Sequence, residues 1–147
     1  FSVYLAFYKF NQSPAKIFLG DVGSIPSGYL VGFLMVSCWF TNGVLLPIVI
    51  VNMYYIFDTS ITLLIRIINK DNIFEAHSNH FYQKMIRKGY SHSLVLKWIF
   101  SLNSILLILS LLSLKLPTIS FIFSILFTTA LLYLFYLKKK IWVSEFF

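Results

Sequence analysis

The chain has 147 residues, of which 59% are hydrophobic and 12% are charged, and its mean hydropathy is +0.81. These values exclude an ordinary soluble globular domain and predict an integral membrane protein. The formal net charge of +7 suits a surface that faces anionic lipid or phosphate, and it needs no nucleic-acid partner to explain it. The single cysteine, Cys38, lies in an apolar run, which excludes a disulfide framework and a cysteine-rich metal site.

The first apolar stretch runs from Phe1 to Tyr8 and is broken at Lys9, and a polar connection that contains Pro14 follows Phe10. No basic region precedes this stretch and no cleavage signature follows it, so it does not resemble a signal peptide. The chain also opens on Phe1 rather than on a methionine. We therefore expect the end of a helix that begins earlier, in a longer protein.

A polar interruption follows, in the run Phe18-Leu19-Gly20-Asp21-Val22-Gly23-Ser24. Glycines permit backbone angles and close approaches that other residues do not, and a carboxylate offers the hard oxygen ligands that suit Mg²⁺. One interpretation is therefore a metal or phosphate site at Asp21. The other is that Asp21 and Ser24 only cap the helix that follows.

Beyond this interruption, the apolar segments are long enough to cross a bilayer, since 20 helical residues extend about 30 Å. The predicted fold class is all-α: a polytopic transmembrane helical bundle with four complete spans plus the end of an earlier one, in a single membrane domain over residues 1–147. A short polar turn at Thr41-Asn42-Gly43 should make the first two spans antiparallel. The predicted spans cover residues 22–41, 44–65, 94–114 and 118–137, and residues 66–93 form a cytoplasmic loop.

The second predicted span carries Asp58, which would lie about 21 Å along a straight helix from Val44. A charged group inside a span normally faces protein or water and is functional by default. A structural hydrogen bond to a neighbouring helix or loop is the alternative. Pro47 lies near the start of this span, where it allows a kink without requiring one.

The polar loop contains all three histidines of the chain. In a helix, His77 and His80 would share one face and could present imidazoles to a metal or phosphate, although an ordinary solvated histidine is the commoner situation. Gly89 is expected to end a helix in this loop, and Ser91 is expected to cap the next one.

The basic residues indicate the orientation of the chain. All of them except Lys115 fall on one face of the predicted topology, and that face should be cytoplasmic. Asp21, the inner end of the span with Asp58, and the histidine loop all reach the same face in this topology. The residues on that face are Lys9, Lys16, Arg66, Lys70, Lys84, Arg87, Lys88, Lys97, Lys138, Lys139 and Lys140.

Three runs together carry a resemblance to a known family. They are Asn11 to Ser24, Phe57-Asp58-Thr59 followed by Arg66, and Ala76 to Gln83 followed by Gly89-Tyr90-Ser91-His92. Their order and spacing resemble the polyprenyl-phosphate N-acetylhexosamine-1-phosphate transferases, the superfamily that includes the phospho-MurNAc-pentapeptide translocase. The family's paired aspartates and its central asparagine-aspartate motif belong to the N-terminal half and are absent here, so the chain looks like the C-terminal half.

The histidine loop can be aligned with the family's His-x-His-His pattern in two registers. Without a gap, His80 takes the first position, and Tyr82 and Gln83 replace the other two histidines. With a three-residue insertion, His77 takes the first position instead. The ungapped form is similar to the branch that initiates O-antigen lipopolysaccharide or other surface polysaccharides.

The resemblance implies a Mg²⁺-dependent transferase of the bacterial inner membrane, with its active face in the cytoplasm. Such an enzyme moves a sugar 1-phosphate from a UDP-sugar to an undecaprenyl-type phosphate in cell-envelope synthesis, and this chain alone should be inactive. A homodimer is left open, and the alternative is a non-catalytic small membrane protein, such as an assembly subunit or a channel component. The implied site contains Asp21 as the metal ligand, His80 and Asp58 as catalytic groups, and His77, Arg66, Lys84 and Arg87 as substrate-binding groups.

Overall fold

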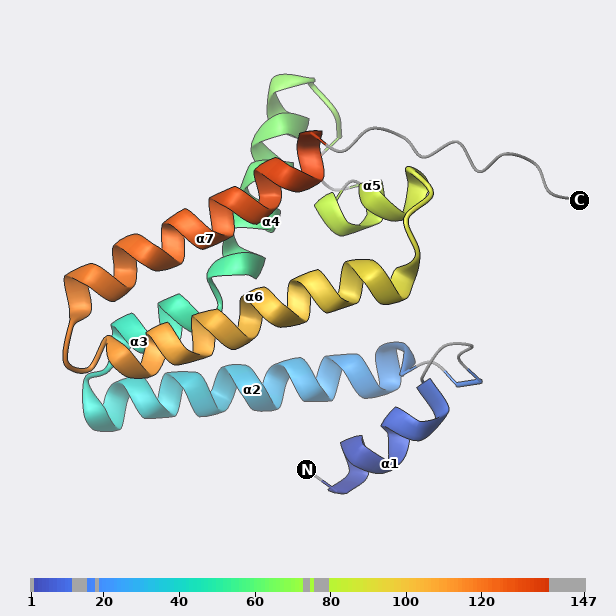
Figure 1. Cartoon of the computed structure of the whole chain (residues 1–147). Coiled ribbons are helices and arrows are strands. Elements are labelled where there is room, and N and C mark those ends of the chain that lie inside the picture. The colour runs from blue at the N-terminus through green and yellow to red at the C-terminus, as the bar shows by residue number, and fades with distance from the viewer. Residues whose placement is uncertain (1, 12–15, 18, 73–74, 76–79, 138–147) are drawn as a thin grey trace, which may run out of the picture. The chain divides into compact units, whose positions relative to one another are not determined.

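The computed structural model describes residues 2–11, 16–17, 19–72, 75 and 80–137, and every regular element within these ranges is an α-helix (Figure 1). The predicted all-α, polytopic class is therefore confirmed. The helices are α1 (Ser2–Asn11), α2 (Gly20–Asn42), α3 (Leu45–Val51), α4 (Met53–Ile68), α5 (Phe81–Arg87), α6 (His92–Leu112) and α7 (Pro117–Leu137).

The chain forms two compact units, residues 1–43 and 44–147. In the first, α2 is a 23-residue apolar helix that is long enough to cross a membrane, and none of its residues is buried within the structure. It ends where the sequence predicts a turn, because Gly43 takes a left-handed conformation (φ 67°) and donates its N–H to the carbonyl of Trp39 at 2.8 Å. Such a glycine closes a helix by satisfying a carbonyl of its last turn.

In the second unit, α6 and α7 lie side by side and run in opposite directions, joined by a short turn that contains Lys115 (Figure 1). Both helices are long and apolar enough to cross a membrane. As predicted, Ser91 caps α6, since its hydroxyl accepts the N–H of Leu94 at 3.3 Å. Among the described residues, three helices can span a membrane, or four if α3 and α4 count as one crossing.

The expected crossing at residues 44–65 consists of two helices, α3 and α4, which meet at Asn52 at an angle of 66°. Pro47 lies in the first turn of α3, where its missing N–H costs no helical bond, so it does not cause the break. Instead, Asn52 donates its side-chain amide to the carbonyl of Ile48 at 2.8 Å, and Ser110 of α6 donates its hydroxyl to the carbonyl of Pro47 at 2.9 Å. These bonds satisfy backbone groups that would be costly to leave unpaired in a membrane.

The core of the second unit lies where α3, α4, α5, α6 and α7 meet. Its buried apolar residues come from all five helices, and α7 turns the small residues Ser120, Ser124 and Thr128 toward it at intervals of four. Small side chains let membrane helices approach closely. The core residues are Ile50, Met53, Tyr54, Phe81, Met85, Val95, Leu102, Leu106, Leu132 and Phe135.

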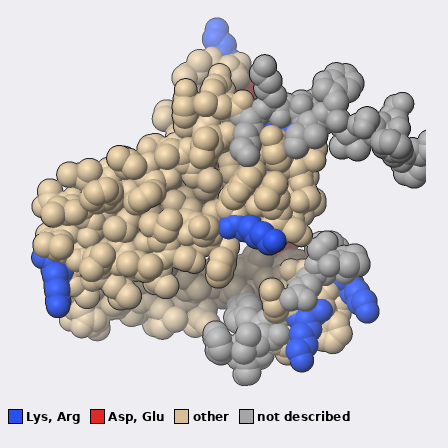
Figure 2. Space-filling model, viewed as in Figure 1, with Lys and Arg blue, Asp and Glu red and all other residues tan. Residues whose placement is uncertain are grey.

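The outward faces of α6 and α7 expose large apolar side chains, including Phe100, Leu111 and Tyr136. No Lys, Arg, Asp or Glu occurs within α7. On the face of the molecule that Figure 2 shows, charged side chains are few. An exposed apolar surface of this kind is expected where helices face lipid rather than water.

Candidate functional site

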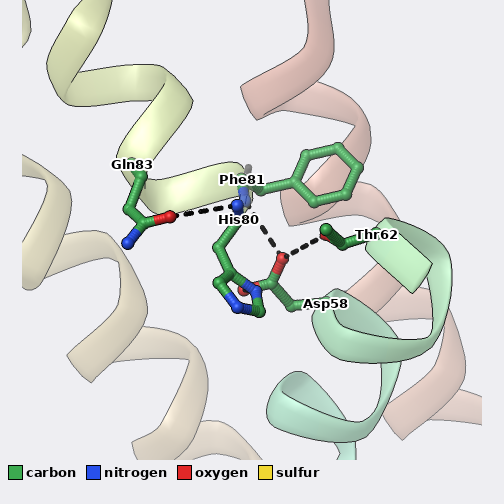
Figure 3. A network of polar contacts seen from close by, with 5 residues as sticks. All are labelled: Asp58, Thr62, His80, Phe81 and Gln83. Atoms are coloured by element: carbon green, nitrogen blue, oxygen red, sulfur yellow. Dashed lines mark hydrogen bonds and ion pairs between the residues drawn. The ribbon is translucent and has the colours of Figure 1, made fainter. Parts of the chain in front are cut away.

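A buried carboxylate, Asp58, joins α4 to the beginning of α5 (Figure 3). Its Oδ1 accepts the backbone N–H of Phe81 at 3.0 Å and faces the hydroxyl of Thr62 at 3.5 Å, while its Oδ2 lies 3.4 Å from Nδ1 of His80. Only 4% of Asp58 is exposed, and a carboxylate at such a position is stable only when it is hydrogen-bonded. The structure thus brings together two predicted site residues that are far apart in the sequence.

His80 immediately precedes α5 and has an extended backbone (φ −60°, ψ 152°). Its N–H donates to Oε1 of Gln83 at 3.2 Å, its ring lies 6.1 Å from the ring of Tyr82, and its side chain is 26% exposed. Because His80 lies before the helix, the helical phase that related it to His77 does not extend to it. His77 lies outside the described residues.

The opposite end of α5 is attached to α7. Lys88 donates from Nζ to the carbonyls of Phe135 and Tyr136, at 3.0 and 3.1 Å, in the last turn of α7. Gly89 follows with φ 96°, as expected for a glycine that ends a helix. Sequence reasoning missed this role of Lys88, because its partners are backbone atoms that no sequence pattern marks.

Lys84 and Arg87, two predicted substrate-binding residues, lie on α5 itself. The Nζ of Lys84 lies 5.3 Å from the centre of the Phe81 ring. Partial burial lowers the pKa of Lys84, the charge of Arg87 lowers it further, and the charge of Asp58 opposes them. The helix after His80 therefore carries cationic groups near the Asp58 network.

Arg66 is 4% exposed and lies at the C-terminal end of α4. Its guanidinium donates to the carbonyls of Asn72 and Glu75, the latter at 3.3 Å. It thereby closes the loop that follows α4 onto the helix, and the predicted contact between Arg66 and substrate stays a prediction.

Asp21 lies in the first unit, in the first turn of α2, and its side chain is exposed. Leu19 occupies the N-cap position and α2 has no side-chain cap, so neither Asp21 nor Ser24 caps this helix. Gly20 has φ 59°, and a Cβ on Gly23 would lie 2.6 Å from side-chain carbons of Leu19. Gly20 therefore supplies a backbone conformation that residues with a side chain rarely adopt, whereas a side chain at Gly23 would require Leu19 to shift.

A single exposed carboxylate such as Asp21 is compatible with Mg²⁺, which often takes one or two carboxylates and completes its shell with water and substrate phosphate. An exposed carboxylate in the first turn of a helix is also stabilised there by the helix dipole. Within the described part of the chain, no cluster of three or more His, Cys, Asp or Glu side chains could hold a metal. Asp21 would thus supply one ligand, and a magnesium ion there would take its other ligands from water, substrate or other parts of the protein.

Comparisons with known proteins agree on one family. The model of glycosyl transferase family 4 matches residues 1–39, which include Asp21. The chain is 32% identical over 113 residues, 70% of its length, to a probable undecaprenyl-phosphate N-acetylglucosaminyl 1-phosphate transferase of Bacillus subtilis. It is 36% identical over 115 residues, 76% of its length, to a phospho-N-acetylmuramoyl-pentapeptide-transferase of Buchnera aphidicola.

The phospho-N-acetylmuramoyl-pentapeptide-transferase of Sorangium cellulosum is 30% identical over 115 residues. The chain spans about a third of the length of the relatives it matches, 31% of the Bacillus protein and 30% of the Buchnera protein. No solved structure gives a significant match. The family match around Asp21, together with relatives aligned over most of the chain, shows that the chain belongs to the polyprenyl-phosphate N-acetylhexosamine-1-phosphate transferase superfamily, glycosyl transferase family 4.

Proposed function

We propose that the chain is the C-terminal part of an enzyme that transfers a sugar 1-phosphate from a UDP-sugar to undecaprenyl phosphate. The observation that carries this proposal is the exposed Asp21 in its glycine-shaped turn, inside the residues matched by the family model. The relative in Bacillus is named for transfer of N-acetylglucosaminyl 1-phosphate with undecaprenyl phosphate, and the relative in Buchnera is named as a phospho-N-acetylmuramoyl-pentapeptide-transferase. The proposed product belongs to cell-envelope polysaccharide synthesis, and Tyr82 and Gln83 favour the surface-polysaccharide branch over the peptidoglycan one.

In the proposed reaction, an oxygen of the lipid phosphate attacks the phosphorus that carries the sugar, and the bond to UMP breaks. Asp21 would hold Mg²⁺, whose chemistry is to neutralise charge on the pyrophosphate and on the departing UMP. His80 would contact the donor phosphate, since its ring is partly exposed at the start of α5. Lys84 and Arg87, which lie on α5, would bind anionic groups of the substrates.

We propose that the active face is cytoplasmic and that the membrane is the bacterial inner membrane. Lys88 holds α5 at the end of the α6–α7 pair opposite Lys115. Because α5 also carries Lys84 and Arg87, the basic residues of the second unit gather at that end, which supports a cytoplasmic orientation for it. Tags after Gly43 and near Lys115 should report the outer side, and a tag at Lys70 the inner side. If Gly43 and Lys70 report the same side, α3 and α4 form a re-entrant loop rather than a crossing.

The direct test is to incubate the complete gene product with undecaprenyl phosphate and a panel of UDP-sugars and to measure UMP release. Release of UMP together with a lipid-linked sugar phosphate would support the transferase and identify its donor. If no UDP-sugar yields UMP, the non-catalytic alternative, an assembly subunit or channel component, is favoured. The 147-residue chain alone should be inactive in this assay.

A further inference from the structure

We propose that Asp58 and Lys88 are positioning residues that fix α5 between α4 and α7 and thereby hold His80 in place. The contacts that hold α5 are structural and do not depend on the proposed function. Only the expected effect of His80 placement on catalysis rests on that function. It assigns Asp58 a role through the backbone of α5 rather than as a general base or metal ligand.

The first tie is made at the N-terminal end of α5. The first N–H groups of any helix have no partner within the helix, and the N–H of Phe81 finds one in Oδ1 of Asp58 at 3.0 Å. Hydrogen bonds to a charged acceptor are stronger than neutral ones, and burial strengthens them further. Since His80 is the residue directly before Phe81, the same bond fixes its backbone.

The second tie is made at the C-terminal end of α5 and uses the opposite charge. Lys88 donates to two main-chain carbonyls in the last turn of α7, those of Phe135 and Tyr136. A cation at the C-terminal end of a helix is also favoured by the helix dipole. Lys88 therefore holds α5 against α7 and stabilises the end of α7.

Both ties are needed because α5 is short. A helix of seven residues is unstable on its own in water, so its conformation depends on what it packs against. Phe81 and Met85 anchor one face in the core, and Met85 is 0% exposed. Apolar contacts resist separation but tolerate sliding, whereas the two directional bonds fix the position of α5 along α4 and α7.

Two substitutions at position 58 separate this role from catalytic ones. Asp58→Asn keeps a side-chain oxygen that can accept the N–H of Phe81, whereas Asp58→Ala removes it. If Asp58 acted as a base or metal ligand, both variants would lose activity to a similar extent. Under our proposal, Asp58→Asn keeps kcat within about threefold, and Asp58→Ala lowers kcat by at least about tenfold with a smaller change in KM.

Thiol labelling provides a readout that needs no activity. Met85→Cys is introduced into the complete gene product, in membranes, after Cys38 and any other native cysteine are replaced by serine, and maleimide modification is timed. Asp58→Ala and Lys88→Met should each speed the labelling at least about tenfold, because opening of α5 exposes its buried face. Asp58→Asn and Lys88→Arg should label at nearly the parent rate.

Matched controls are Asp71→Ala and Lys97→Met, which remove an exposed acid and an exposed base and should leave the labelling rate unchanged. Parent-like labelling of both Asp58→Ala and Lys88→Met would overturn the proposal. So would a loss of activity in Asp58→Asn as large as in Asp58→Ala with labelling unchanged, since this would indicate a chemical role. If Asp58→Ala does not accumulate, two measurements still test the proposal: the labelling rate of Lys88→Met, and the activity and labelling rate of Asp58→Asn. Failure of the UMP assay alone would affect the proposed function and leave the labelling result valid.

Discussion

The two units of the chain carry their polar groups in different ways. In residues 1–43, Asp21 is exposed on a helix with no buried residue, and the turn that presents it is shaped by neighbouring glycines. In residues 44–147, Asp58 is buried and bonds to a residue 23 positions away. The comparison shows that a locally built site can be read from a sequence motif, whereas a site built by packing needs coordinates.

The largest expected effect tests the exposed acid. Asp21→Asn should lower turnover of the complete enzyme by about 10²-fold or more, because it removes an anionic metal ligand and charge compensation in the transition state. Folding should be unaffected, since Asp21 is exposed and caps nothing. UMP release across a range of Mg²⁺ concentrations measures the effect, and added Mg²⁺ should restore part of the loss. Normal turnover at low Mg²⁺ would contradict the metal-ligand assignment.

The next effect tests whether the packed region contributes a phosphate contact instead of a metal ligand. His80→Ala should lower turnover by about tenfold to 10²-fold, the loss expected when a hydrogen bond to a charged group, worth about 1.5–3 kcal/mol, is removed. The loss should be nearly independent of Mg²⁺ concentration, in contrast to that of Asp21→Asn. A Mg²⁺ titration of both variants in parallel separates them, and equal rescue of the two would mean that His80 acts at the metal.

A smaller effect concerns the break between α3 and α4. Ser110→Ala leaves the carbonyl of Pro47 without its hydroxyl donor and should lower the free energy of unfolding by about 1 kcal/mol. Ser104→Ala is the matched control on the same helix, because its hydroxyl donates to the carbonyl of Phe100 within α6 rather than to another helix. Thermal unfolding in detergent compares the two, and equal midpoints would show that the bond to Pro47 adds no stability.

The smallest expected effect is on the titration of Lys84. Burial and Arg87 lower its pKa, so Nζ should become neutral and react with an acylating reagent at a lower pH than the amine of a free lysine side chain. Because the charge of Asp58 raises this pKa, Asp58→Asn should move the reaction to a still lower pH, whereas Arg87→Gln should move it upward. Mass spectrometry after brief labelling at several pH values measures these shifts. A shift of the opposite sign in Asp58→Asn would contradict the placement of Lys84 near that carboxylate.

Much of the fold was predictable because its signals are local. Long apolar runs predict α2, α6 and α7, and single residues mark helix ends, as Gly43, Gly89 and Ser91 do. The break at Asn52 could not be predicted, because one of the backbone groups beside it, the carbonyl of Pro47, accepts from the hydroxyl of Ser110, 63 residues away on α6. Likewise, the sequence indicated Asp58 as a polar group of interest but not its partner.

The same distinction applies to the candidate site. The glycines beside Asp21 mark it in the sequence, and the structure shows that Gly20 takes a left-handed conformation there, while the metal role of Asp21 stays a prediction. His80 was placed by its motif, but its position before α5 rather than within it depends on the capping contacts of the helix. Lys88 was overlooked, since a lysine near the end of a helix is usually a solvated surface residue.

The two ties that hold α5 share a property that matters for detecting them across species. In each, a side chain bonds to main-chain atoms: Asp58 to the N–H of Phe81, and Lys88 to the carbonyls of Phe135 and Tyr136. A main-chain acceptor persists whatever residue occupies its position, and a main-chain donor is lost only at proline. Substitutions at these partner positions keep the main-chain atoms, so they seldom require a compensating change at Asp58 or Lys88. Pairs of positions joined by such contacts should covary only weakly. Contact maps inferred from covarying pairs would therefore underestimate how firmly α5 is held.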